Sequence, residues 1–122
     1  VSDQARISAT SLIEFRSDTI SRSTLWTGTL ETGKWINWLF HVRWSSQYDG
    51  LTQVWKNEVP IIQFKGPNAY NDFLGPYLKL GVYVPKWKKG QPNGTTLVRS
   101  VMFDDIHVRE GECSLDTICG FL

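Results

Sequence analysis

Residues 35–44 read WINWLFHVRW, and this stretch decides the fold class. Aromatic and β-branched side chains are typical of strands, and successive residues of a strand point to opposite faces. The even positions are all apolar, namely Ile36, Trp38, Phe40, Val42 and Trp44. The odd positions are mixed, namely Trp35, Asn37, Leu39, His41 and Arg43. The pattern predicts a strand whose even face is turned toward the core.

Two tight turns continue this strand into a meander. SSQYDG places Asp49 and Gly50 at the tip of a hairpin, and LTQVWKN (51–57) is the returning strand. Asn57 and Glu58 predict a second tight turn, which leads into VPIIQFKG (59–66). Pro60 near the start of that run indicates an edge strand or a strand opening.

The rest of the chain has the same character. Further strands are predicted over RISATSLIEFR (6–16), TLWTGTL (24–30), YLKLGVYV (77–84) and LVRSVMFDDIHV (97–108). No helix of three turns is predicted. Many short strands separated by turns favour an all-β jelly roll or concanavalin-like β-sandwich. We expect one such domain over residues 1–122, with 110–122 as a tail.

Length and composition fit this fold and narrow the function classes. The chain has 122 residues, 41% hydrophobic and 20% charged, with a net charge of +1 that gives no reason to expect nucleic acid. No apolar run approaches the roughly 20 residues that span a membrane. Because the chain begins at Val1 without Met or a signal peptide, we expect a processed product. The chain has six Trp, six Phe and four Tyr, most of which we expect to pack in a sandwich core. Some of them are candidates for stacking against sugar rings.

Two features favour secretion. Cys113 and Cys119 lack the neighbouring ligands of a zinc site, which leaves a small disulfide loop or two free thiols. The triplet at residues 93–95, NGT, has the form of a glycosylation acceptor. We therefore expect a secreted, extracellular protein.

The run GPYLKLGVYVPKW (75–87) holds the main chemical candidates. Alternation places Tyr77, Lys79 and Tyr83 on one face, with Gly81 between them, and we expect that face to be exposed. The other face is apolar, with Leu78, Leu80, Val82 and Val84 predicted to turn inward. By itself this pattern is more typical of an ordinary solvated sheet face.

The order of these segments resembles the C-terminal part of polysaccharide lyases of the glucuronan lyase and heparin lyase type. The resemblance is carried by GKWINWLFHVRWSSQYDGLTQVWKNEVPI, GPYLKLGVYVPKW and VMFDDIHV, over roughly residues 33–109. Jelly-roll alginate lyases share the Tyr-x-Lys-x-Gly strand. The family's Asn-Gly turn reads Asn57-Glu58 here, and its upstream Gln-x-His element is missing. The chain therefore looks like half of a larger lyase sandwich, and we expect a second chain or a homodimer to complete it.

The resemblance implies β-elimination on an acidic, uronic acid polysaccharide. In the resembling families the first tyrosine of the Tyr-x-Lys-x-Gly motif is catalytic, and Tyr77 occupies that position here. The lysine of the motif, which corresponds to Lys79, lies beside the substrate. Tyr83 would position the sugar. A free phenol ionises near pH ~10, so a tyrosine acting as a base needs cationic neighbours, and Lys79 is one. A non-catalytic, lectin-like carbohydrate-binding protein on the same scaffold is the alternative.

Further candidates follow from position and residue type. Arg43 or Arg16 could meet a carboxylate, His41 is a weaker candidate on the same strand as Arg43, and Trp87 among lysines could form a lip over a polyanion. Each has an ordinary structural or solvated alternative. Jelly-roll carbohydrate proteins often hold structural calcium, for which Asp104 and Asp105 are the candidates, one predicted to point inward. No organic cofactor is expected.

Overall fold

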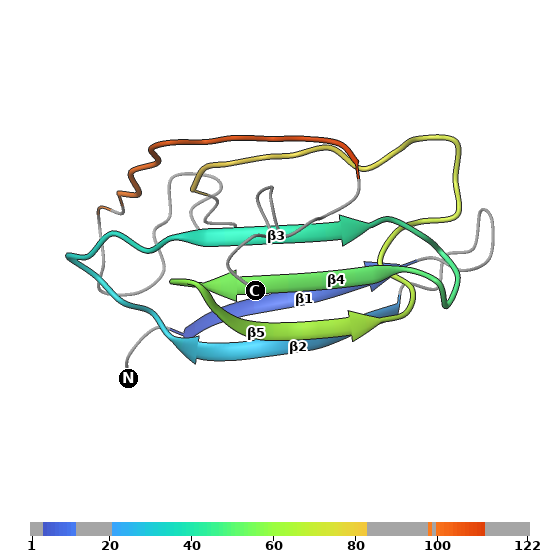
Figure 1. Cartoon of the computed structure of the whole chain (residues 1–122), viewed down its shortest axis with the longest axis horizontal. Coiled ribbons are helices and arrows are strands. Elements are labelled where there is room, and N and C mark those ends of the chain that lie inside the picture. Colours follow the sequence, from blue (N-terminus) through green and yellow to red (C-terminus); the bar gives the residue numbers. More distant parts are fainter. Residues whose placement is uncertain (1–3, 12–20, 83–97, 99, 112–122) are drawn as a thin grey trace. The chain divides into compact units, whose positions relative to one another are not determined.

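The computed structural model describes residues 4–11, 21–82, 98 and 100–111. These residues divide into two compact units, one ending at Pro76 and the other lying within Tyr77–Gly111. All regular structure of the described residues lies in the first unit, which holds five strands and no helix (Figure 1). The chain is therefore all-β, as the sequence predicts, while the single-domain organisation stays a prediction.

The first sheet is a two-stranded antiparallel ribbon. It pairs β1 (Gln4–Ser11) with β2 (Ser21–Thr29), and the register shifts between Ile7 and Ser8. Ala9 is its buried residue. Polar residues alternate with Ala and Ile along most of β1, which suits a ribbon with one solvated side.

The second sheet is the predicted meander. It contains β3 (Trp38–Arg43), β4 (Leu51–Lys56) and β5 (Val59–Lys65), all antiparallel and in the order β3-β4-β5. β5 is an edge strand, as Pro60 indicates, and its register shifts opposite Val54 and Trp55. Both predicted hairpins are confirmed, because Arg43 pairs with Leu51 and Lys56 with Val59.

The turn between β4 and β5 has an unusual conformation for its sequence. Asn57 and Glu58 both have positive φ, 48° and 68°. Two successive positive φ values define the type I′ turn, whose twist matches that of the flanking strands. The Asn57 side chain accepts a hydrogen bond from Asn37 N at 3.0 Å, which fixes the turn against the start of β3.

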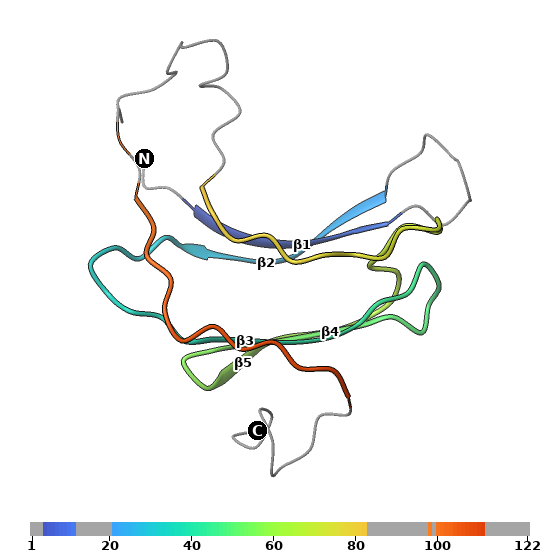
Figure 2. The ribbon, with the colours of Figure 1, turned by 90° about the horizontal axis from the view of Figure 1, so that it is seen from above.

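The two sheets of the first unit form two layers (Figure 2). The Trp26 ring of β2 meets the Trp38 ring of β3 edge-on at 6.0 Å, and Lys56 Nζ of β4 lies 5.5 Å from the Trp26 ring centroid. Val54 is fully buried and Ile62 nearly so. Since register pairs Val54 with both Phe40 and Ile62, these three share the face that is turned toward β2. Two antiparallel layers of this kind are consistent with a β-sandwich or jelly roll.

The predicted burial of the even face of residues 35–44 is only partly correct. Trp38 and Phe40 do share a face with the buried Val54, yet they are 39% and 50% exposed and stack on each other. Trp44 is also exposed, beyond the end of β3. Among the strands that the structure describes, β3 pairs with β4 alone, so its side chains have a neighbouring described strand on one flank only.

Two predicted strands are wrong in the part that the structure describes. Residues 77–82 are extended but join no ladder, and Leu78, Leu80 and Val82 are exposed rather than turned inward. Residues 98 and 100–108 join none either, and Asp105 adopts a φ of 54°, which interrupts an extended run. Alternation specifies faces, but a strand also needs a neighbour for its backbone hydrogen bonds.

A buried asparagine ties the chain that leaves β5 to the first hairpin. Asn68 Nδ2 donates to the carbonyls of Arg43 and Leu51 and to the Thr52 hydroxyl, each at 3.1 Å. Its Oδ1 accepts from Ser45 N at 2.9 Å. Gly50 packs so closely on Gly66 O that a side chain there would collide with it. The described part of the chain contains no helix able to cross a membrane.

Candidate functional site

Tyr77 and Lys79 lie side by side in the second unit. Both side chains are exposed, Tyr77 to 76%, and Lys79 Nζ lies 5.1 Å from the centroid of the Tyr77 ring. Residues two apart in an extended segment project to the same side, which produces this contact even without a sheet ladder. The prediction that the two share an exposed face is confirmed. Tyr83 and Trp87, the substrate-binding candidates nearby, lie outside the described residues.

His41 belongs to the first unit and has a specific partner. Its Nδ1 lies 2.7 Å from Gln53 Oε1, and the register places the two residues directly opposite each other on β3 and β4. An amide oxygen only accepts hydrogen bonds, so Nδ1 donates and the neutral ring keeps its lone pair on Nε2. This contact engages the oxygen of the Gln53 amide and leaves its two N–H groups available as donors. His41 is therefore held in one orientation at half-buried depth.

Arg43 lies one row along the same face. Its Nε donates to Asp49 O at 2.9 Å, and the side chain is exposed. Asp49 itself accepts a hydrogen bond from the Ser45 hydroxyl at 2.6 Å, which lowers the pKa of the Asp49 carboxyl. This contact uses one of the five guanidinium donors, so Arg43 can still meet an anion. Arg16 lies outside the residues that the structure describes.

Comparison with known proteins agrees with this arrangement of segments. A family model described as "Polysaccharide lyase" matches residues 4–107. This chain belongs to the polysaccharide lyase family. The match includes all five strands, Tyr77, Lys79 and Asp104, and it begins well before the region that carries the resemblance. No curated protein and no solved structure matches the chain.

Membership of the polysaccharide lyase family supports a lyase-type function. The finer assignment to the glucuronan lyase and heparin lyase group goes beyond that match. So do the catalytic roles of Tyr77 and Lys79, which stay predictions.

The calcium candidates of this polysaccharide lyase lie in the second unit. Asp104 Oδ1 accepts from Asp105 N at 2.8 Å, and Asp105 Oδ1 lies 2.7 Å from His107 Nε2. Both aspartates are exposed, so the expected inward carboxylate is wrong, because the backbone turns at Asp105. Calcium takes six to eight oxygen ligands, and among the described residues no group of three or more acidic, His or Cys side chains could hold a metal. The carboxylates of Asp104 and Asp105 supply too few oxygen ligands to complete a calcium coordination shell. Calcium binding therefore stays a prediction.

Sequence reasoning missed several polar residues of the second sheet. Gln53 and Gln63 are register partners of each other, and Gln53 is also the partner of His41. Trp55 is 3% exposed, and its Nε1 has no hydrogen-bond partner. Alternation along 51–56 and 59–65 places these residues opposite the core face, but only the register aligns them with His41. The predicted disulfide of Cys113 and Cys119 and the glycosylation triplet at 93–95 lie outside the described residues.

Proposed function

We propose that this chain cleaves an acidic polysaccharide at a uronic acid by β-elimination, as a lyase of the glucuronan lyase and heparin lyase-like group. Two observations support the proposal. The family match spans residues 4–107, and an exposed phenol and ammonium lie 5.1 Å apart, ring centroid to nitrogen, in the segment that carries the Tyr-x-Lys-x-Gly pattern. The single observation that carries it is this pairing of Tyr77 with Lys79.

β-Elimination at a uronate sets three tasks. The proton on C5, next to the carboxylate, is a very weak acid, so a cation or hydrogen-bond donor must stabilise the enolate-like charge. A base must remove that proton. The electron pair then forms the C4–C5 double bond, and the bond from C4 to the glycosidic oxygen breaks. An acid returns a proton to that oxygen, so the products are a new chain end and an unsaturated uronate.

Tyr77 and Lys79 divide these tasks. The Tyr77 hydroxyl exchanges the proton with C5 or with the leaving oxygen, since it is exposed and free to reach a polymer. Lys79 either stabilises the ionised form of Tyr77 or binds the uronate carboxylate. Tyr83 would position the sugar, and Gly81 leaves room for its ring to approach.

The remaining parts of the proposal concern context. An acidic polysaccharide is an extracellular polymer, so we place the chain outside the cell. A second chain or a second copy would complete the sandwich, because Trp38, Phe40 and Leu80 are exposed apolar side chains that proteins normally cover. Sedimentation and intact mass of the purified material test whether such a partner is present.

The test is cleavage of polyglucuronate, heparin and alginate, followed by the ultraviolet absorbance of the unsaturated product. We expect the wild-type chain to raise the absorbance with at least one polymer and Tyr77→Phe to abolish that rise. Tyr70→Phe is the matched control, because Tyr70 is another partly exposed tyrosine of the described chain. Binding of a polymer without any rise would favour the lectin-like alternative and refute the lyase reaction.

A further inference from the structure

The outer side of the β3-β4-β5 sheet carries an ordered set of polar side chains. Gln53 is the register partner of both His41 and Gln63, so the three residues form one row across the three strands. Residues directly opposite in an antiparallel pair share a face, with side chains about 5 Å apart. Two residues along each strand, Arg43, Leu51 and Lys65 form the next row. We call the surface made by His41, Arg43, Gln53, Trp55, Gln63 and Lys65 the His41 face.

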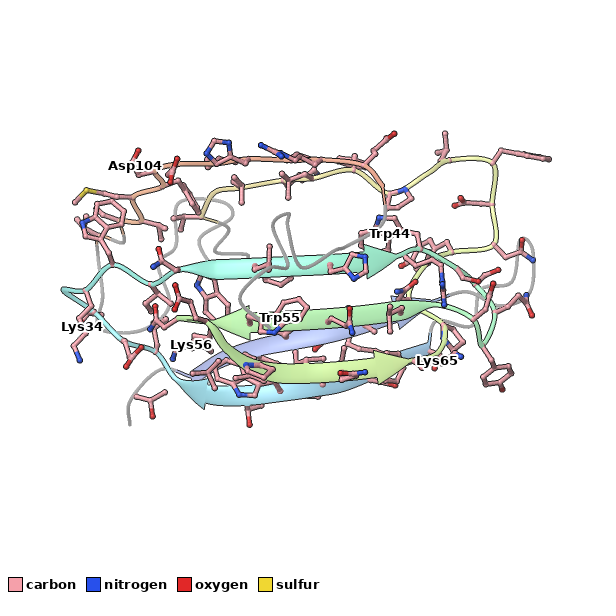
Figure 3. All side chains as sticks on the ribbon, in the orientation of Figure 1. Lys34, Trp44, Trp55, Lys56, Lys65 and Asp104 are labelled. Atoms are coloured by element: carbon pink, nitrogen blue, oxygen red, sulfur yellow. The ribbon has the colours of Figure 1, made fainter. Side chains whose placement is uncertain are left out.

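The three strands contribute only cations to this face, while the Asp49 carboxylate at the first hairpin tip lies close enough to interact with both Arg43 and Lys65. β3, β4 and β5 read WLFHVR, LTQVWK and VPIIQFK, so none of the three strands contains Asp or Glu. Their third cation, Lys56, lies on the opposite face, where Glu31 Oε2 is 3.0 Å from its Nζ and Trp26 lies beneath it. Arg43 and Lys65 are both exposed, and their shared register partner Leu51 places them on the His41 face. Figure 3 shows Lys65 on β5. Arg43 and Lys65 lie two strands apart, about 10 Å.

Hydrogen-bonding groups lie beside these cations. Gln63 is exposed, and Gln53 keeps its amide donors while its oxygen is engaged by His41. Trp55, two residues from Gln53 on β4, adds a buried indole N–H that has no partner. Buried polar atoms are nearly always hydrogen-bonded, so this orphan donor is an unsatisfied position beside the polar row.

We propose that the His41 face binds an acidic oligosaccharide segment, with Arg43 and Lys65 meeting carboxylates and Gln53, Gln63 and His41 meeting hydroxyls. This inference rests on the proposed function, since it takes the ligand to be part of the same uronic acid polymer. Cations suit carboxylates, and side-chain amides both donate to and accept from sugar hydroxyls. A polymer held on one surface raises its effective concentration at a second site on the same chain.

The experiment uses the full chain carrying Tyr77→Phe, so that the ligand is not consumed. A glucuronic acid hexasaccharide is titrated while amide and indole N–H resonances are followed by NMR, and affinity is measured by calorimetry. Gln63→Ala with Lys65→Ala tests the face, because both residues are exposed and their loss spares the core. Gln47→Ala with Lys34→Ala removes the same two side-chain types from exposed positions elsewhere and is the matched control.

We expect the hexasaccharide to shift the Trp55 indole resonance and the Gln53 and Gln63 amide resonances. The Gln63/Lys65 double variant should bind the hexasaccharide at least about tenfold more weakly than the Tyr77→Phe parent. The Gln47/Lys34 double variant should bind it with the same affinity as the parent. A neutral glucose hexasaccharide should bind at least about tenfold more weakly than the acidic one. Equal binding by the two double variants, or equal binding of the neutral sugar, overturns the inference. Failure of the lyase proposal is seen separately, as absence of product from the wild-type chain.

Discussion

Lys79 Nζ lies over the ring of Tyr77, 5.1 Å from its centroid, and both side chains are open to solvent. A cation at this distance from an aromatic face is attracted to it, by about 0.5–1 kcal/mol at an exposed site. The contact holds the two groups side by side, and the first prediction tests the role proposed for Lys79.

Replacing Lys79 should reduce the proposed cleavage without unfolding the chain. We expect Lys79→Met to lower kcat/KM on polyglucuronate by about a hundredfold, the usual loss when one charge-stabilising group is removed. Lys79→Arg keeps the charge and should retain most of the rate. Lys34→Met, at another exposed lysine, is the control. Wild-type kcat/KM in Lys79→Met would remove Lys79 from the mechanism.

Loss of Asn68 should destabilise the first hairpin. Asn68→Ala leaves Ser45 N and the carbonyls of Arg43 and Leu51 without their side-chain partner in a buried place. We expect the free energy of unfolding to fall by about 2–3 kcal/mol, measured by urea denaturation.

Asn68→Asp discriminates between lost volume and lost donors. It keeps the acceptor for Ser45 but puts an oxygen against the two carbonyl oxygens of Arg43 and Leu51, so at neutral pH it should be at least as damaging as Asn68→Ala. If Asn68→Asp were as stable as the wild-type chain, the donor contacts would carry no stability.

The turn between β4 and β5 should gain stability from glycine. Glu58 has a φ of 68°, a conformation that costs an L-residue about 1–2 kcal/mol, whereas glycine adopts it without a steric penalty. Glu58→Gly should therefore raise the free energy of unfolding by about 0.5–1 kcal/mol after the entropy of glycine is included. Glu58→Ala removes the same carboxyl but keeps the strain, so it should give no such gain. A loss of stability in Glu58→Gly would show that the turn is not strained.

The contact between Lys56 and Glu31 should make folding sensitive to acid. A hydrogen bond from Lys56, aided by its charge, holds the pKa of the Glu31 carboxyl below its ordinary value of 4.5. A carboxyl whose pKa is lower in the folded chain favours folding above its ordinary pKa, and this contribution disappears as the pH falls through the folded value. Glu31→Gln should therefore lose less stability between neutral pH and acid than the wild-type chain. NMR titration of Glu31 checks the direction, and an unshifted titration would contradict it.

Much of the first unit follows from local patterns in the sequence. Alternation along 38–43 and 51–56, the turn residues before Leu51 and the Asn57-Glu58 pair together predict the meander that the structure contains. These signals succeed because turn geometry and side-chain period act over a few residues, and hairpin pairing is local. The same local period also predicts correctly that Tyr77 and Lys79 lie side by side.

Only the tertiary structure decided which of these patterns find partners. It exposes Trp38 at the edge of its sheet, leaves residues 77–82 without a ladder, and turns the chain at Asp105. It also aligns His41 with Gln53 and Gln63, three residues that no motif connects. The physical reason is that alternation determines which way a side chain points, whereas register and neighbouring strands determine what it meets.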